Sequence, residues 1–347
     1  MGEVIFTWPD VLSRLIAGSD LTAEQTGWAM REILSGAATP SQIAGFAVAL
    51  RAKGETIDEV EGLVATMYEF ATPLRYDGRA VDIVGTGGDR SHTVNISTMA
   101  ALVTAGADVP VVKHGNRAAS SSCGSADVLE GLGIPLDLSP ERVEEIARKT
   151  GLTFCFAPVF HSALRHSAVP RRELGVATTF NFLGPLANPS RPAAQAVGVA
   201  DLRLAGIIAG VLARRGVDGF VFRGNDGLDE LTTTTTSQIW SIVEGVVTEQ
   251  ELDPAALGID RAAPVDLRGG DVTFNAAVVR RLLDGEPGPV RDAVLLNAAA
   301  GIAAYDVEDA PLLDRLRSGL AQAERAVDSG AAKAKLSRWV SVAASVD

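Results

Sequence analysis

A short apolar run that ends in glycines could bring a phosphate close to the backbone. The segment GTGGD at 85–89 directly follows the hydrophobic run VDIV. Glycines let successive backbone N–H groups converge on one anion, because they accept conformations that other residues avoid. The segment is neither a Rossmann GxGxxG nor a Walker loop, since Asp89 and Arg90 stand where those patterns require other residues. The alternative is a plain strand-to-helix turn with Ser97 as an ordinary N-cap.

The next segment, TVNIST at 93–98, adds hydroxyl and amide side chains to the same region. Asn95, Ser97 and Thr98 lie just ahead of the apolar run MAALVTAGA, which predicts a helix. A helix N-terminus offers unpaired N–H groups and the positive end of the helix dipole. A second phosphate or a metal-bound oxygen could therefore bind here.

A third polar segment, KHGNRAASSSCGSAD at 113–127, follows the hydrophobic run VPVV. Lys113 follows that predicted strand, so it is expected to bring a cation to the carboxyl edge of a sheet. Gly124 and Ser125 begin another predicted helix and give a second N-terminal anion site. The alternative is a solvated polar loop. The donors in this segment suit an anion with several phosphate oxygens; they are His114, Asn116, Arg117, Ser120, Ser121, Ser122 and Ser125.

Acidic residues follow a further strand-like run, FVF, in the segment GNDGLDEL at 224–231. Its adjacent pair, Asp229 and Glu230, offers hard oxygen ligands suited to Mg²⁺ shared with substrate phosphates. A protein of net charge −12 needs local cations if it binds a polyphosphate. The alternative is an acidic surface turn.

The elements that must position these segments can be predicted from periodicity. From residue 81 onward, short apolar runs alternate with Gly-rich turns and helical stretches, which predicts an α/β fold with a mostly parallel central sheet flanked by helices. Ligands in such folds bind outside the carboxyl ends of the strands, so the loops after these runs are the candidate site. The tract Thr232–Thr236 is expected to be an ordinary strand or turn.

The first seventy residues have a different pattern, with three capping boxes. Each pairs a Thr with a Gln or Glu three positions later and predicts the start of a helix. No titratable cluster accompanies them, so we expect a small all-helical N-terminal domain that serves packing or oligomerisation. The pairs are Thr22 with Gln25, Thr39 with Gln42, and Thr56 with Glu59.

Composition excludes several classes of protein. A length of 347 residues suggests about two domains, and the net charge of −12 opposes binding to nucleic acid or to an anionic membrane. The longest apolar run, at 204–213, is too short to span a bilayer, and the first residues lack a basic stretch before an apolar block. Cys123 and Cys155 are too few for a disulfide framework or a zinc site. We expect a soluble cytoplasmic protein.

The segments at 85–98, 113–127 and 224–231, in this order, resemble the anthranilate phosphoribosyltransferase family. The stretches APVFHSALRHSAVPRRELG at 157–175 and TFNFLGPLANP at 179–189 extend the resemblance over nearly the whole chain. This family transfers phosphoribose from phosphoribosyl pyrophosphate (PRPP) to the amino group of anthranilate and releases pyrophosphate, with Mg²⁺ bound. The resemblance implies a helical domain over 1–73 completed by helices from about 162–190, and an α/β domain over 80–161 and 191–347. It also implies a pair of Mg²⁺ ions and a homodimer formed through the helical domain.

The resemblance further implies a role for each matched residue. Catalysis would depend on Lys113, Asp229 and Glu230, and the metal would be served by Ser97, Asp229 and Glu230. Anthranilate would be bound by Gly85, His114, Asn116, Arg171, Gly184 and Pro185. Arg171 suits the anthranilate carboxylate, because a guanidinium is a planar fork of donors. PRPP would be bound by Gly85, Gly88, Asp89, Thr93, Asn95, Ile96, Ser97, Thr98, Lys113, Asn116, Ser120, Ser121 and Ser125.

The sequence departs from the family pattern at two positions, and two other functions remain as alternatives. Ala177 and Arg223 stand where the family often has a basic residue and a His, respectively. A pyrimidine nucleoside phosphorylase resembles this family in domain arrangement, but it should lack the acidic pair and the intact KHGNR run. A nucleic-acid-binding relative should have a basic groove and a higher isoelectric point.

Overall fold

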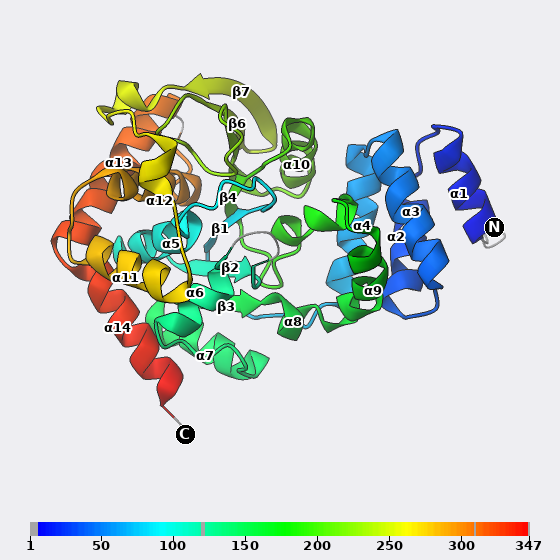
Figure 1. Ribbon diagram of the computed structural model, residues 1–347, viewed down its shortest axis with the longest axis horizontal. Helices are drawn as coiled ribbons and strands as arrows, with labels where there is room; N and C mark the ends of the chain where they lie inside the picture. Colours follow the sequence, from blue (N-terminus) through cyan, green and yellow to red (C-terminus); the bar gives the residue numbers. More distant parts are fainter. Residues whose placement is uncertain (1–5, 119–121, 309, 346–347) are drawn as a thin grey trace.

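A computed structural model describes residues 6–118, 122–308 and 310–345 of the chain. Figure 1 shows a helical bundle beside a larger α/β part, with the N-terminus on the bundle and the C-terminus on the far side of the α/β part. The fold class predicted from the sequence is therefore confirmed. Among the described residues, no helix has both the length and the apolar character needed to cross a membrane.

The bundle begins with four helices, and the last three of them start at the capping boxes found in the sequence. They are α1 (Trp8–Ile16), α2 (Ala23–Leu34), α3 (Pro40–Lys53) and α4 (Ile57–Phe70). The Thr side chains of Thr22, Thr39 and Thr56 each cap the following helix, and the Gln or Glu three positions later bonds back to the cap. A later helix, α9 (Arg165–Leu174), packs on α2 and α3.

The α/β part is built on a seven-stranded sheet in the order β3-β2-β1-β4-β5-β6-β7. The strands from β3 to β5 are parallel, and β6 and β7 continue the sheet as an antiparallel hairpin. Successive connections leave in opposite directions at β1 and β4, so the topological switch point lies between these two strands. The strands are β1 (Val81–Gly85), β2 (Val111–Gly115), β3 (Leu152–Phe156), β4 (Ala194–Gly198), β5 (Asp218–Gly224), β6 (Ser237–Val243) and β7 (Val246–Leu252).

Helices cover both faces of the sheet. The remaining α-helices are α5 (Ile96–Gly106), α6 (Ser125–Gly131), α7 (Pro140–Thr150), α8 (Ala157–Phe160), α10 (Leu202–Arg214), α11 (Val272–Leu283), α12 (Pro289–Tyr305), α13 (Leu312–Asp328) and α14 (Ala331–Ala344). Short 3₁₀ turns complete the connections: η1 (Ser162–Leu164), η2 (Thr179–Asn181), η3 (Gly184–Leu186), η4 (Pro254–Leu257) and η5 (Pro264–Leu267). The tract Thr232–Thr236, expected to be a strand or turn, forms a bend just before β6.

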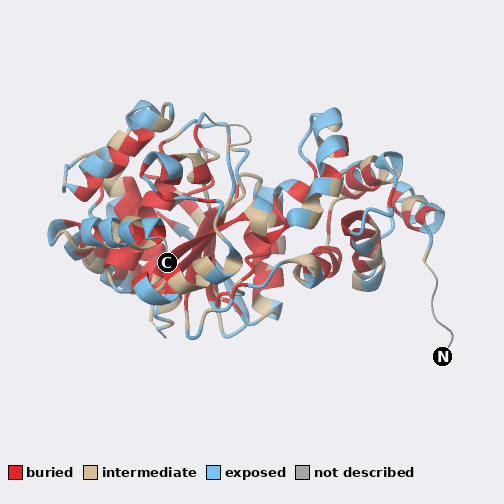
Figure 2. Cartoon of the chain, turned by 90° about the horizontal axis from the view of Figure 1, so that it is seen from below, coloured by how far each residue is buried: buried red, intermediate tan, exposed pale blue. Residues whose placement is uncertain are grey.

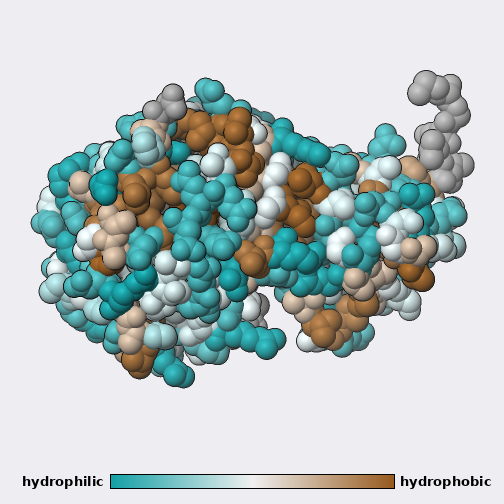
Figure 3. Space-filling view, turned by 90° about the horizontal axis from the view of Figure 1, so that it is seen from above, coloured by the Kyte–Doolittle hydropathy of each residue, from teal (hydrophilic) through white to brown (hydrophobic). Residues whose placement is uncertain are grey.

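Alternate strand residues enter different hydrophobic cores, as the two-residue period of a strand requires. Val81 and Ile83 pack with α5 and α12 on one face. Val84 and Val197 pack on the other face, in one cluster with α10 and the apolar residues of α1–α4. Figure 2 shows the buried strands in the middle of the α/β part, and Figure 3 shows a largely hydrophilic surface with separate hydrophobic patches. The helical bundle and the sheet therefore share one core.

Candidate functional site

The acidic pair lies at the switch point between β1 and β4. A Cβ atom on Gly198, the last residue of β4, would lie 1.7 Å from the carbonyl oxygen of Asp229. A Cβ atom on Gly85, the last residue of β1, would lie 2.3 Å from Asp229 Oδ2. Glycine is required at both strand ends, because any side chain there would displace the segment 224–231, which we call the acidic loop.

Backbone N–H groups of the segments 85–89 and 93–98 donate to the carboxylates of Asp229 and Glu230. The Gly87 N–H donates to Asp229 Oδ2 over 2.7 Å, and the Ser97 N–H donates to Glu230 Oε1 over 3.1 Å. Ser97 lies in the first turn of α5, so the Glu230 carboxylate sits at the positive end of that helix. The loops after β1 and β5 thus meet at one point.

Burial changes the charge state of the pair. It raises the pKa of Asp229 to about 7, with a further contribution from Asp89. It raises the pKa of Glu230 to about 8, with a further contribution from Asp229. Two carboxyl groups that resist ionisation side by side gain most from a cation placed between them.

Lys113 brings a buried amine from the neighbouring strand β2. Lys113 is the third residue of β2; its side chain is buried and its ammonium donates to the Ile83 carbonyl oxygen. Burial lowers the pKa of Lys113, whereas the carboxylates of Asp82, Glu230 and Asp229 raise it. Lys113 therefore lies within the electrostatic reach of the acidic pair.

Two residues that sequence reasoning did not assign to the site hold the acidic loop in place. The Asn297 side chain, fully buried on α12, accepts from the Leu231 N–H and donates to the Leu231 carbonyl oxygen, each over 2.9 Å. Asp226 accepts from the Leu228 N–H over 3.2 Å and from the Thr232 hydroxyl over 2.8 Å. Asp226 therefore stabilises the loop and does not join the acidic pair. The only sequence signal for Asn297 is a lone amide in an apolar helix.

The segment after β1 has the backbone of an anion-binding loop. Gly87 and Gly88 have φ values of 71° and 88°, and Arg90 and His92 follow with 59° and 53°. Such left-handed conformations turn successive N–H groups toward one side. Asp89 and Thr93 are partly exposed beside these residues, with Gly88 between Asp89 and the end of β1.

Asn95 holds the N-cap position of α5, so the alternative with Ser97 as N-cap is wrong. Its side chain makes no cap; it donates to the Cys123 carbonyl oxygen over 3.0 Å and accepts from Asn275 over 2.9 Å. The Thr98 hydroxyl is buried and has no hydrogen-bond partner in the described part of the chain. Ile96 packs in the core, so only its backbone can face a ligand. The first turn of α5 thus faces the acidic pair, because its Ser97 N–H donates to Glu230.

The segment after β2 divides its side chains between the site and α6. Arg117 pairs with Asp127 and Glu130 and stacks over the Phe156 ring at 5.4 Å, so it is committed to α6 and not free as a phosphate donor. Asn116 is exposed beside it, and Ser125 begins α6 next to Gly115. Ser120 and Ser121 lie outside the described residues.

His114 and the turn at 184–185 form a second, less polar side of the region. His114 Nδ1 lies 3.0 Å from the Gly184 carbonyl oxygen, and Pro185 follows in the same turn. Burial lowers the pKa of His114 to about 3, so the ring is neutral. Its buried Nε2 has no hydrogen-bond partner among the described residues. The ring of His161 lies 5.2 Å away, and His161 Nε2 contacts the Ala187 carbonyl oxygen over 2.7 Å, which is a packing role.

Arg171 reaches this side from α9. Its guanidinium lies 5.6 Å from the centre of the Phe180 ring, and burial lowers its pKa. In the described part of the chain it forms no ion pair and no side-chain hydrogen bond, so its fork of donors is available. Among the described residues, no hydrogen bond joins Arg171 to His114 or Asn116; its contact with the Phe180 ring connects it to the 179–185 segment.

The donor set fits a magnesium ion shared with a ligand. No group of three or more His, Cys, Asp and Glu side chains in the described residues is arranged to hold a metal alone. Mg²⁺ needs no such cage, because it is commonly held by one or two carboxylates together with substrate phosphates. Asp229 and Glu230, beside the hydroxyl-bearing first turn of α5, match that pattern.

Comparisons with known proteins agree with this geometry. The family model described as the a/b domain of a glycosyl transferase family matches residues 77–333, and that of its helical bundle domain matches residues 9–71. The anthranilate phosphoribosyltransferase of Nocardioides sp. is 64% identical over 338 residues, covering 97% of this chain and 99% of that protein. The Arthrobacter sp. enzyme is 63% identical over 337 residues, covering 97% and 96%.

Solved structures give the same result. The crystal structure of anthranilate phosphoribosyltransferase from Thermus thermophilus matches with a TM-score of 0.90 at 42% identity, covering 97% of this chain and all of that one. The Saccharomyces cerevisiae enzyme in complex with PRPP and Mg matches with a TM-score of 0.89 at 25% identity, covering 98% of both chains. On these grounds, the chain belongs to the anthranilate phosphoribosyltransferase family of glycosyl transferases.

Proposed function

We propose that this enzyme transfers the 5-phosphoribosyl group of PRPP to the amino group of anthranilate and releases pyrophosphate. One observation carries the proposal. Asp229 and Glu230 accept hydrogen bonds from the segment 85–89, which we call the glycine segment, and from the N-terminus of α5, at the switch point of the sheet. Chains 63–64% identical over nearly their full length have the name of this activity. Neither the phosphorylase nor the nucleic-acid-binding alternative has comparable support.

The PRPP side would be the polar half of the site. The phosphate groups would be held by those backbone N–H groups of 85–89 and of the first turn of α5 that do not donate to the acidic pair, since Gly87 and Ser97 already do. Gly85, Gly88, Asp89 and Thr93 would contribute from β1 and the chain that follows it, and Lys113 would contribute from β2. Lys113 would stabilise the negative charge that develops on the departing pyrophosphate. The donors that remain for the sugar and its phosphate are Asn95, Ser97, Thr98, Asn116 and Ser125, together with the Ile96 backbone.

Asp229 and Glu230 would hold Mg²⁺ together with PRPP, with Ser97 as a further oxygen ligand. Bound there, Mg²⁺ would neutralise charge on the pyrophosphate as it leaves. The yeast relative binds PRPP and Mg, which supports Mg²⁺ as the metal. We propose a pair of ions.

The anthranilate side would bring the amine to the ribose C1. An arylamine is neutral at pH 7 and already nucleophilic, so positioning contributes more than a strong base would. Arg171 would bind the anthranilate carboxylate with its free fork of donors. The neutral His114 and the Gly184–Pro185 turn would line the path beside it, with Asn116 at the boundary between the two substrates.

The fluorescence of anthranilate tests the reaction directly. Purified protein is mixed with anthranilate, PRPP and Mg²⁺, and the loss of anthranilate fluorescence is followed with EDTA and no-enzyme controls. We expect turnover that EDTA abolishes. A flat trace from protein that still binds PRPP would contradict the proposal and direct attention to another nucleophile.

We also propose the division and assembly of the chain. The helical domain covers 1–73 and is completed by helices from about 162–190, and the α/β domain covers 80–161 and 191–347. A homodimer formed through the helical domain would cover apolar side chains such as Ile16 and Val48, which are 79% and 43% exposed. Light scattering should give twice the chain mass, and Ile16→Glu should lower it; a monomeric mass for the wild-type protein would contradict the dimer.

A further inference from the structure

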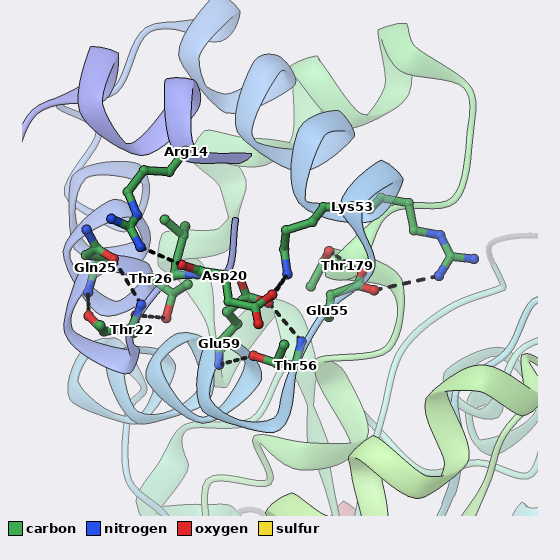
Figure 4. Close-up of polar contacts among 12 residues, drawn as sticks. Arg14, Asp20, Thr22, Gln25, Thr26, Lys53, Glu55, Thr56, Glu59 and Thr179 are labelled. Carbon is green, nitrogen blue, oxygen red and sulfur yellow. Dashed lines mark hydrogen bonds and ion pairs between the residues drawn. The ribbon is translucent and has the colours of Figure 1, made fainter. Parts of the chain in front are cut away.

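Glu55 is a buried carboxylate that joins three separate segments. It lies between α3 and α4, and its side chain is fully shielded from solvent. The Thr179 hydroxyl donates to Glu55 Oε1 over 2.6 Å, and Arg203 of α10 donates to Glu55 Oε2 over 2.7 Å. Figure 4 shows Glu55 facing Thr179 at the edge of the helical bundle. One carboxylate therefore links the bundle, the 179–185 segment and α10.

The cost of burying this carboxylate is only partly offset. Burial raises the pKa of Glu55, while the Thr179 hydroxyl and the Arg51 guanidinium lower it. Arg51 lies 3.9 Å from Glu55 and pairs with Asp201 over 2.7 Å. Losing a partner of such a buried carboxylate is destabilising. The hydrogen bond from Thr179 to Glu55 therefore holds the start of the 179–185 segment against the bundle.

Thr179 transmits that position to the anthranilate side. The next residue, Phe180, lies beneath the Arg171 guanidinium, and five residues beyond Thr179 the Gly184 carbonyl contacts His114. The intervening chain is stiff, because the Phe182 N–H donates to the Thr179 carbonyl over 3.3 Å and Phe182 and Leu183 are buried. A shift at Thr179 would therefore displace the surroundings of Arg171 and of His114 together.

We infer that Glu55 is a positioning residue for anthranilate that acts through Thr179 and leaves the PRPP side unaffected. Its described side-chain contacts are with Arg51, Thr179 and Arg203, and none of these lies on the glycine segment, on α5 or on the acidic loop. The inference rests on the proposed function. It predicts that the loss of Glu55 raises the KM for anthranilate but not the KM for PRPP, a difference that a general loss of stability would not produce.

Steady-state kinetics of four variants test the inference. We expect Glu55→Ala and Thr179→Val each to raise the anthranilate KM about tenfold or more, since small misplacements of a binding group are costly, and to change the PRPP KM by less than about twofold. Thr179→Ser restores the hydroxyl and should behave like wild type. Glu59→Gln is the matched control: the Glu59 side chain is equally buried, and among the described residues it bonds only to Lys53, Thr56 and Leu21 of the bundle, so this variant should lower the thermal midpoint without a KM change.

The outcomes separate this inference from the proposed function. Wild-type turnover with equal rises in both KM values for Glu55→Ala, or an unchanged anthranilate KM for Thr179→Val, would overturn the inference alone. If Glu55→Ala does not fold, the Thr179→Val and Thr179→Ser pair decides the matter. Absence of turnover in the wild-type protein would overturn the proposed function and this inference with it.

Discussion

At the scale of single residues, the site concentrates groups that are costly to bury. Asp229 and Glu230 lie at a sheet edge where desolvation opposes their charge, and Lys113 is buried beside them. Such perturbed groups are typical of functional sites, since a stable fold alone does not require them. On the proposed function, the acidic pair would lower the stability of the fold in exchange for an ability to hold a cation and its phosphates.

The pH dependence of stability should show this trade. The folded pKa values of about 7 and about 8 lie above the ordinary 3.8 and 4.5, so between these limits the folded protein binds more protons than the unfolded chain. The free energy of unfolding of the metal-free protein therefore falls as pH rises through that range. Urea unfolding at about pH 6 and about pH 8 should show a smaller fall for the Asp229→Asn, Glu230→Gln double variant, because its amides do not titrate. An equal fall in both proteins would contradict the assignment.

Lys113 should contribute to catalysis and not only to charge balance. Lys113→Met keeps the length of the side chain and removes the ammonium, and we expect kcat/KM to drop ~100-fold or more, as for other lost electrostatic donors. Lys149→Met is the control, since Lys149 is half exposed and in the described part of the chain pairs with Glu145 alone. A loss of tenfold or less for Lys113→Met would remove this residue from the mechanism.

Arg171 should act on one substrate. We expect Arg171→Ala to raise the anthranilate KM about tenfold or more, because a hydrogen-bonded charge pair is lost, with a smaller effect on kcat. The neighbouring Arg172 is exposed, so Arg172→Ala should leave both KM values unchanged. An unchanged anthranilate KM in Arg171→Ala would count against a carboxylate contact.

At the scale of elements, the ends of the parallel strands decide what the site can hold. Gly85 and Gly198 let the acidic loop enter between β1 and β4, and Asn297 of α12 holds the loop from behind. The loop is thus fixed by backbone contacts and by a helix on the far side. Its geometry depends on packing as much as on its own residues.

Gly198→Ala tests this dependence. The new methyl group would overlap the Asp229 carbonyl, so the loop must shift, and we expect kcat/KM to fall ~100-fold. Gly206→Ala is the matched control, because a Cβ atom on Gly206, within α10, would meet nothing within 4 Å. Comparable activity in the two variants would show that the loop tolerates displacement.

Local and long-range features differed in how well the sequence predicted them. The capping boxes predicted the starts of α2, α3 and α4 because each depends on residues three apart. The alternation of short apolar runs with helical stretches likewise predicted a parallel sheet, and with it the edge where the loops after β1 and β5 meet. Arg117 was grouped with the phosphate donors because its partner Glu130 lies thirteen residues away on α6. Glu55 gave no signal, since its partners Thr179 and Arg203 are more than a hundred residues distant.

At the scale of the whole molecule, the helical bundle and the sheet are not independent bodies. One hydrophobic cluster contains Leu63 and Met67 of α4 together with Val197, Val221 and Trp240 of the sheet. Helix α10 lies so close to α4 that a Cβ atom on Gly210 would meet the Ile57 side chain at 2.4 Å. Motion between the two parts must therefore work against a shared core.

Equilibrium unfolding should accordingly be cooperative across both parts. We expect far-UV circular dichroism and tryptophan fluorescence to give one coincident transition, since a shared core couples the two parts. A fragment of residues 1–73 should remain largely unfolded, because it lacks the sheet residues that complete its core. Two separated transitions, or a folded fragment, would show instead that the bundle is autonomous.

The turn before the acidic pair has a consequence for the chemical ageing of the protein. Asp226 precedes Gly227, and an Asp–Gly bond rearranges when the glycine nitrogen attacks the aspartate side chain. Here the Gly227 N–H donates to the Gly224 carbonyl oxygen over 2.9 Å, and the Asp226 carboxylate accepts from Leu228 and Thr232. The attacking and attacked groups are therefore both occupied. The hydrogen bonds that shape the acidic loop also protect its backbone, so this bond should rearrange more slowly in the folded enzyme than in the unfolded chain.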